Sequence, residues 1–136
     1  MYNCGLIKLK CFKDKYGDLV PIEQCKDIPF EMKRIYYIGN VAKDATRGFH
    51  SHKVLHQLLI CVSGSVKIRV KNPNGEEIYD LNDKSVGLYI GPLIWREMFD
   101  FSEEAVLLVL ASEYYDESDY IRDYDHYLEE AKKLFN

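Results

Sequence analysis

The stretch "RGFHSHKVLHQLLICVSGSV", residues 47–66, combines a histidine cluster with a long apolar run. It contains three of the four histidines of the chain, His50, His52 and His56. Alternate residues of a β-strand project to the same face, so a strand here places His50 and His52 side by side. The apolar run at 56–64 is typical of a strand that is buried on both faces. Two imidazoles on one surface predict a metal site or a proton-transfer site.

The flanking sequence continues as short strands separated by turns. Alternating, β-branched or apolar segments occupy residues 4–12, 15–23, 33–41, 65–71, 77–81, 86–93, 95–101 and 105–111. The Asn-Gly pair at 74–75 is a strong signal for a β-hairpin. Strands at intervals of roughly 8 to 12 residues predict an antiparallel sandwich or barrel.

The pattern changes near the end of the chain. Residues 118–135 carry acids early and lysines late, as the helix dipole prefers. Tyrosines and apolar residues recur there at helical spacing, which leaves His126 on the polar side. We therefore predict one all-β domain over residues 1–136, with a barrel at about 4–113 and a C-terminal α-helix at about 118–135.

Composition restricts the partners and the compartment. The 136 residues carry a net charge of −4 without a basic cluster, which argues against nucleic acid or an anionic membrane as a partner. No apolar run reaches the roughly 18 residues that a transmembrane helix needs, and no signal peptide is apparent, so a cytoplasmic protein is expected. Its four cysteines have no metal-type spacing and are expected to be free thiols, with Cys61 in the core.

A metal site would need ligands beyond the histidine pair. Metal-binding cupin barrels carry His-x-His, then Glu, then Gly, and a later strand with another histidine. The spacing here resembles that pattern, but Gln57 stands at the Glu position and Arg96 lies near the last histidine position. A glutamine is a weak neutral ligand, and Arg96 would place a fixed cation beside the metal. We expect no metal, although His56, which has the same strand parity, could supply the missing ligand.

Without a metal, two histidines flanked by tyrosine and arginine suit acid–base chemistry. Imidazole takes up and returns protons near neutral pH, and arginine supplies a fixed positive charge for phosphate or an oxyanion. Tyr36 and Tyr37 face opposite ways on a strand, so one of them at most enters the barrel.

Four segments together identify a family: "RGFHSHKVLHQLLICVSGSVKI", "GLYIGPLIWREMFDFS", "VLLVLAS" and "YYDESDYIRDYDHY". They resemble the nucleotide-sugar 3,4-ketoisomerases of the cupin superfamily, the WxcM-like group, over nearly the whole chain. The resemblance implies an RmlC-like jelly-roll barrel and a homodimer with exchanged N-terminal strands. It implies dTDP-4-keto-6-deoxy-D-glucose as substrate and a 3-keto isomer, for a later aminotransferase, as product. Because some galacto-forming relatives carry histidine at the position of Arg96, a gluco product is favoured, with Tyr16 and Arg96 shaping the pocket.

The chemistry of this reaction agrees with the residues. The C3 proton is α to the C4 ketone and therefore acidic, so one base, one relay or acid and an oxyanion stabiliser suffice, without a cofactor. The expected catalytic residues are His50 as carbon base, His52 as relay or orienting partner and Tyr36 as hydroxyl acid, with Arg47, Gln57 and Arg96 holding the sugar or pyrophosphate. Two alternatives stay open: a metal-dependent cupin enzyme and a non-catalytic cupin that binds nucleotide sugars.

Overall fold

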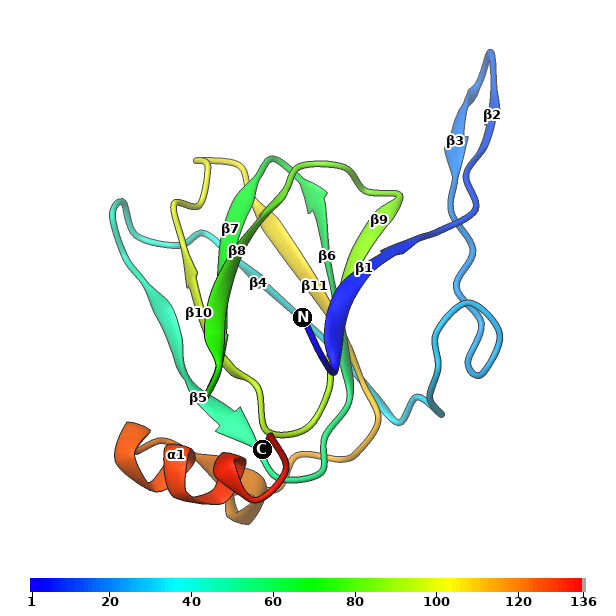
Figure 1. The fold of residues 1–136 in the computed structure, drawn as a ribbon. Helices are drawn as coiled ribbons and strands as arrows, with labels where there is room; N and C mark the ends of the chain where they lie inside the picture. Colours follow the sequence, from blue (N-terminus) through cyan, green and yellow to red (C-terminus); the bar gives the residue numbers. More distant parts are fainter. Residues whose placement is uncertain (136) are drawn as a thin grey trace.

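Two five-stranded antiparallel sheets face each other and enclose the core (Figure 1). The structure is a computed structural model that describes residues 1–135. One sheet has the order β1-β9-β6-β11-β4, and the other has the order β12-β5-β10-β7-β8. The strands of the first sheet are β1 (Cys4–Lys8), β9 (Val86–Ile90), β6 (Gln57–Ser63), β11 (Val106–Ala111) and β4 (Arg34–Gly39). Those of the second are β12 (Tyr120–Ile121), β5 (Arg47–His52), β10 (Trp95–Phe99), β7 (Val66–Asn72) and β8 (Gly75–Leu81). The prediction of an all-β, antiparallel fold with a C-terminal helix is confirmed.

Side-chain alternation explains which faces are buried. In β7, Val66, Ile68 and Val70 are fully buried between the sheets, while the residues between them are only partly buried. In contrast, β6 is buried on both faces, as its apolar run predicts. The segment that connects β1 to β4 crosses the outer face of β6, where Ile28 and Phe30 join a second apolar cluster. Full burial of each such side chain contributes roughly 1.5–3 kcal/mol before conformational entropy is counted.

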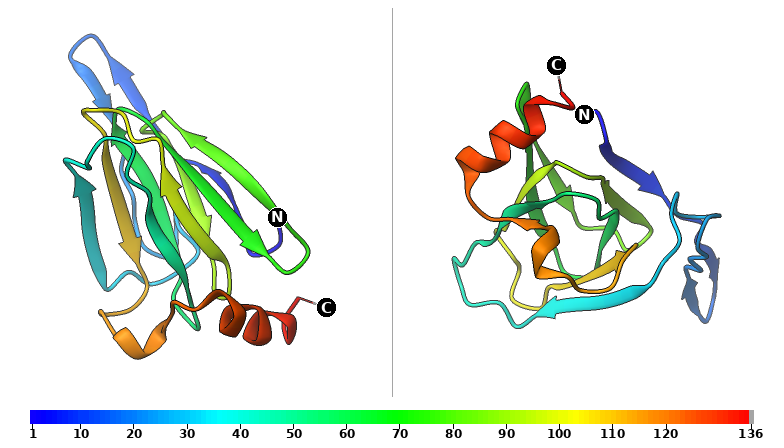
Figure 2. Two further views of the ribbon diagram at one scale, coloured as in Figure 1. Left: turned by 90° about the vertical axis from the view of Figure 1, so that its left-hand side faces the viewer. Right: turned by 90° about the horizontal axis from the view of Figure 1, so that it is seen from below.

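The helix α1 (Tyr124–Lys132) begins later than the sequence predicts. Asp123 is its N-cap, and the side chain of Asp123 accepts a hydrogen bond from the backbone N–H of His126. The preceding residues form a short 3₁₀ helix, η1 (Glu117–Asp119), and then β12, which pairs with the end of β5. Pairing with β5 therefore replaces the first turns of the expected helix. The segment from η1 through α1 lies across one end of the barrel (Figure 2).

A hairpin of β2 (Phe12–Asp14) and β3 (Gly17–Leu19) stands away from the barrel (Figure 1). Its large side chains Phe12, Tyr16 and Leu19 are all exposed, and Tyr16 reaches 85 %. Three exposed apolar or aromatic side chains on one short hairpin form a surface that is suited to contact with another chain.

Two further features concern the state of the cysteines and the length of the helices. All four cysteines are free thiols, and Cys61 is buried in the core as predicted. Within residues 1–135, no helix combines the length and the apolar character that crossing a membrane requires.

The hydroxyl of Tyr127 is expected to hold α1 on the barrel. Tyr127 is fully buried, and its hydroxyl lies 2.9 Å from the carbonyl of Lys71 and 3.0 Å from that of Leu93. Tyr127→Phe leaves these partly buried carbonyls without their donor and should lower the free energy of unfolding by about 1–3 kcal/mol.

Urea denaturation measures this loss. The matched control is Tyr124→Phe, since Tyr124 packs against Trp95 but its hydroxyl makes no hydrogen bond within residues 1–135. The control should change stability by less than about 0.5 kcal/mol. Equal losses in the two variants would contradict this account of α1.

Candidate active site

His50 and His52 lie on β5 with both rings toward the barrel interior, where their centroids are 5.0 Å apart and edge to face. A β-bulge precedes them, because Gly48 pairs with Glu97 while His50 pairs with Arg96. Gly48 has a φ of +98°, and a Cβ there would lie 2.9 Å from the carbonyl oxygen of Arg96. Glycine is therefore required before the histidine pair, and the bulge re-aims the end of β5.

Arg96 crosses the interior from the neighbouring strand. It is 2 % exposed, and its guanidinium donates to the side-chain oxygen of Gln57 and to the carbonyl of Ile94. The amide nitrogen of Gln57 then donates to the hydroxyl of Tyr36 over 3.0 Å. This line of hydrogen bonds joins β10 of one sheet to β6 and β4 of the other. Tyr37, one residue along β4, points outward and is 73 % exposed.

The segment before α1 covers the histidines. The carboxylate of Asp119 lies 3.1 Å from Nδ1 of His52. The ring of Tyr120 lies 4.3 Å from that of His52 and 5.0 Å from that of His50, measured between centroids. The sequence predicts a helix over these two residues and therefore gives neither of them a role at the site. The acids at 116–119, just before the tyrosine, were the available signal for a turn.

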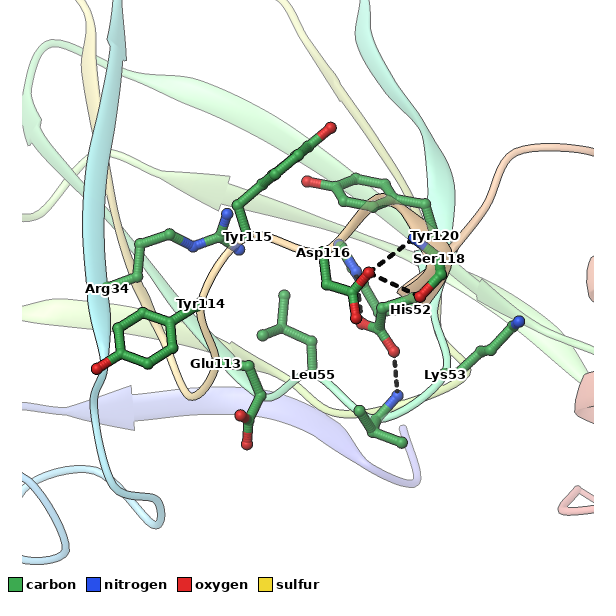
Figure 3. Close-up of a pocket in the computed structure, with 12 residues that line it drawn as sticks. Arg34, His52, Lys53, Leu55, Glu113, Tyr114, Tyr115, Asp116, Ser118 and Tyr120 are labelled. Atoms are coloured by element: carbon green, nitrogen blue, oxygen red, sulfur yellow. Dashed lines mark hydrogen bonds and ion pairs between the residues drawn. The ribbon is translucent and has the colours of Figure 1, made fainter.

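An open cavity of about 380 Å³ leads to His50. It is lined by Arg34, Tyr36, Ile38, Arg47, Gly48, His50, Met98, Tyr115, Tyr120 and Arg122. A neighbouring cavity of about 600 Å³ shares Arg34, Tyr115 and Tyr120 with it (Figure 3). Both volumes are in the range of small-molecule sites. Three arginines line the first cavity, which makes it suitable for an anionic ligand.

Two of these arginines, Arg34 and Arg122, are not among the site residues predicted from the sequence. Arg34 stacks on Tyr36 and on Tyr115, with its guanidinium carbon 5.3 Å and 5.7 Å from the ring centroids. Arg122 lies 4.3 Å from the ring centroid of Tyr120 and forms a two-point ion pair with Glu117. No motif marks either residue, because each reaches the cavity only through the fold.

Two residues that the sequence analysis names lie away from the histidine pair. Tyr16 lies on the protruding hairpin and does not line the cavity of its own chain. The prediction that His56 could be a third metal ligand is wrong. It assumes that His56 continues the strand that carries His50 and His52, but β5 ends at His52 and the chain turns before β6. Its Nδ1 lies 2.7 Å from the hydroxyl of Tyr89, and its ring stacks on Phe30, outside the histidine pair.

The residues around the pair do not fit a metal ion. Within residues 1–135, no three His, Cys, Asp or Glu side chains converge as metal ligands. The guanidinium of Arg96 occupies the interior instead, hydrogen-bonded to the oxygen that Gln57 would otherwise offer. A buried cation next to the histidines opposes a second cation at the same place.

Burial keeps both imidazoles neutral. It lowers the pKa of His50 to about 3, and the nearby Arg96 cation lowers that pKa further. Burial, and then the Arg96 cation, also lower the pKa of His52. Burial raises the pKa of Tyr36. Nδ1 of His50 and Nε2 of His52 are buried and have no hydrogen-bond partner among residues 1–135. At neutral pH the pair therefore provides lone pairs beside a buried cation, which suits proton abstraction.

Comparison with known proteins agrees with this geometry. The family model described as "FdtA: WxcM-like, C-terminal" matches residues 2–132. The chain belongs to the WxcM-like family. This WxcM-like protein is 46 % identical over 129 residues to the TDP-4-oxo-6-deoxy-α-D-glucose-3,4-oxoisomerase of Aneurinibacillus thermoaerophilus, across 95 % of this chain and 93 % of that one. The predicted family resemblance is confirmed.

Solved structures extend the comparison to the fold. QdtA, a sugar 3,4-ketoisomerase from Thermoanaerobacterium thermosaccharolyticum solved with TDP, is 68 % identical and has a TM-score of 0.98, over 100 % of this chain and 99 % of that one. WlaRB, a TDP-quinovose 3,4-ketoisomerase from Campylobacter jejuni, is 45 % identical with a TM-score of 0.91, over 95 % and 99 %. The predicted cupin jelly-roll is thereby confirmed.

Acid is expected to destabilise the WxcM-like protein through His50. A histidine whose pKa falls on folding binds more protons in the unfolded chain, so the free energy of unfolding rises with pH between the folded and unfolded pKa values. For His50 this window runs from about 3 to 6.5. His50→Asn removes one such histidine. The slope of the free energy of unfolding against pH should therefore fall by up to about 1.4 kcal/mol per pH unit in this window.

Urea denaturation of both proteins at several pH values between 7 and 4.5 measures the two slopes. The same slope in the variant and the original protein would show that His50 is not held neutral by the fold.

Proposed function

We propose that this protein converts TDP-4-keto-6-deoxyglucose into its 3-keto isomer by proton transfer through an enediolate, without a metal ion. One observation carries the proposal: half-buried His50 and buried His52, each with an unpartnered buried nitrogen among residues 1–135, lie beside buried Arg96, and His50 lines a cavity that three arginines also line. The relatives act on this class of compound. The Aneurinibacillus thermoaerophilus protein is a TDP-4-oxo-6-deoxy-glucose oxoisomerase, and a histidine-to-asparagine variant of QdtA was solved with TDP-4-keto-6-deoxyglucose.

Proton transfer from C3 and to C4 is assigned to His50. A neutral imidazole removes the C3 proton, and the electron pair moves into an enediolate whose negative charge lies on O4. Arg96 is a buried cation without a carboxylate partner among residues 1–135, so an anion forming close to it is stabilised strongly. His50 then delivers the proton to C4, and the ketone stands at C3.

The hydroxyl proton must also move, from O3 to O4. His52 acts as the relay and Tyr36 as the hydroxyl acid in this scheme, and Gln57 orients Tyr36 through the hydrogen bond already described. The reaction consumes and releases nothing: one proton passes from C3 to C4, and another passes from O3 to O4. The product is a 3-ketone, the substrate class of an aminotransferase that makes 3-amino sugars.

Binding of the nucleotide is assigned to the cavity arginines. Arg34, Arg47 and Arg122 line this cavity, and a diphosphate is an appropriate ligand for them. The gluco configuration at C4 is favoured by Arg96, and the identity to a TDP-quinovose ketoisomerase (45 %) exceeds that to a TDP-fucose ketoisomerase (35 %). Tyr16 is proposed to contribute from another protomer, because it lies outside the cavity of its own chain. A nucleotide-sugar substrate supports the proposal that the protein acts in the cytoplasm.

His50→Asn tests the assignment of the carbon base. Loss of an acid–base group should slow isomerisation by roughly 10²–10⁴-fold or more. In D₂O, the original protein should incorporate deuterium at the sugar carbons that exchange, whereas His50→Asn should show almost none while still binding TDP. Proton NMR reports the exchange, and calorimetry reports the binding.

The matched control is His126→Asn, at a histidine on the exposed side of α1 whose side chain is 49 % exposed. It should isomerise normally. Normal exchange in His50→Asn together with loss in His52→Asn would reverse the two roles. If neither substitution slows exchange, the carbon base is another residue. If the original protein exchanges no deuterium, it is a binding module rather than an isomerase.

The protein is proposed to be a homodimer with exchanged N-terminal strands, which is supported by the exposed apolar hairpin β2–β3. Multi-angle light scattering should give twice the chain mass of 15.9 kDa at micromolar concentration. Replacing Phe12 and Leu19 with serine should shift the population toward monomer, because apolar contact area is lost. A monomeric original protein would contradict the proposal.

A further inference from the structure

Asp119 connects the covering segment to the histidine pair through three separate contacts. One carboxylate oxygen lies 3.1 Å from Nδ1 of His52. The other accepts a hydrogen bond of 2.9 Å from the backbone N–H of Val54, and the carbonyl oxygen of Asp119 accepts one of 3.0 Å from the N–H of Lys53. The next residue, Tyr120, pairs with His52 across β12 and β5. Asp119 therefore fixes the turn after β5 and one histidine ring at once.

We infer that Asp119 is a positioning residue that holds neutral His52 in the tautomer with the proton on Nδ1, so that Nε2 serves as the proton acceptor of the relay. This inference rests on the proposed function. It follows from the chemistry of the pair: an ionised carboxylate can only accept hydrogen bonds, so Nδ1 must donate. A neutral imidazole has one N–H, and Nε2 is then left with a lone pair.

The surroundings of Nε2 agree with this assignment. His52 is 1 % exposed, and Nε2 is buried without a hydrogen-bond partner among residues 1–135. Leaving a buried polar atom unpaired costs about 1–3 kcal/mol, which a purely structural histidine would avoid. The ring of His50 lies next to it. An acceptor is thus kept free beside the proposed carbon base.

The relay step can be written with this tautomer. Nε2 accepts the proton from the O3 hydroxyl, which forms an imidazolium with a proton on each nitrogen. The carboxylate of Asp119 stabilises this cation while it exists. Nε2 then returns the proton to O4, and His52 regains the Nδ1–H tautomer. In the opposite tautomer, Nε2 would carry a hydrogen at the start and could not accept the proton.

The experiment uses the full chain, with ¹⁵N-labelled histidine, and Asp119→Asn as the variant. An asparagine can still accept from the N–H of Val54, but its amide N–H₂ can donate to Nδ1 and favour the Nε2–H tautomer. Long-range ¹H–¹⁵N NMR identifies the tautomer of His52, and calorimetry measures TDP affinity. The control is Asp116→Asn, the same charge change three residues away, where the carboxylate accepts hydrogen bonds from the backbone N–H and the hydroxyl of Ser118.

The expected results are an Nδ1–H tautomer in the original protein, a shift toward Nε2–H in Asp119→Asn, and a fall in kcat on the order of 100-fold. TDP affinity should change less than threefold, and Asp116→Asn should isomerise normally. An Nε2–H tautomer in the original protein would overturn the inference even if the variant failed to fold. So would full activity in Asp119→Asn, or an equal loss in Asp116→Asn. If the original protein isomerises no sugar, the proposed function fails, and its own His52 tautomer still decides whether Asp119 orients the ring.

Discussion

The site depends on a buried arginine that has no anionic partner among residues 1–135. The guanidinium of Arg96 is held between the sheets by the amide oxygen of Gln57 and the carbonyl oxygen of Ile94. Neither group carries a full charge, and no carboxylate lies within ion-pair distance of Arg96 in the described part of the chain, residues 1–135. Burial lowers the pKa of this guanidinium, although arginine keeps its proton in proteins. Desolvating a charge costs several kcal/mol, so the fold must supply that energy elsewhere.

The remaining properties of the site follow from this charge. The cation disfavours protonation of His50 and His52, which leaves both as neutral bases, and it opposes a metal ion in the interior. It also favours any anion that forms near it, as an enediolate does. Two apolar clusters stabilise the barrel against the cost of the buried cation, because buried residues of β6 contribute to both of them and fully buried residues of β7 to one. The stability of the barrel and the reactivity of the site are therefore linked.

The sequence was most informative where one strand decides the outcome. The two-residue period placed His50 and His52 on one face and separated Tyr36 from Tyr37. It was least informative where distant segments meet. The start of α1 was misplaced because β12 pairs with β5 across about 70 residues of sequence, and Asp119 and Tyr120 reached the site only through that pairing. His56 was misplaced because a chain reversal between β5 and β6 breaks strand parity.

The central claim is that the buried cation and neutral histidines move a ketone from C4 to C3 without a metal. The most direct test is ¹³C NMR of TDP-4-keto-6-deoxyglucose, labelled in the sugar, after addition of protein that has been dialysed against EDTA. The account predicts that the C4 ketone signals decline and C3 ketone signals replace them. An unchanged 4-ketone, a sugar epimerised at C3 that is still a 4-ketone, or isomerisation that returns only when a divalent ion is added would contradict it.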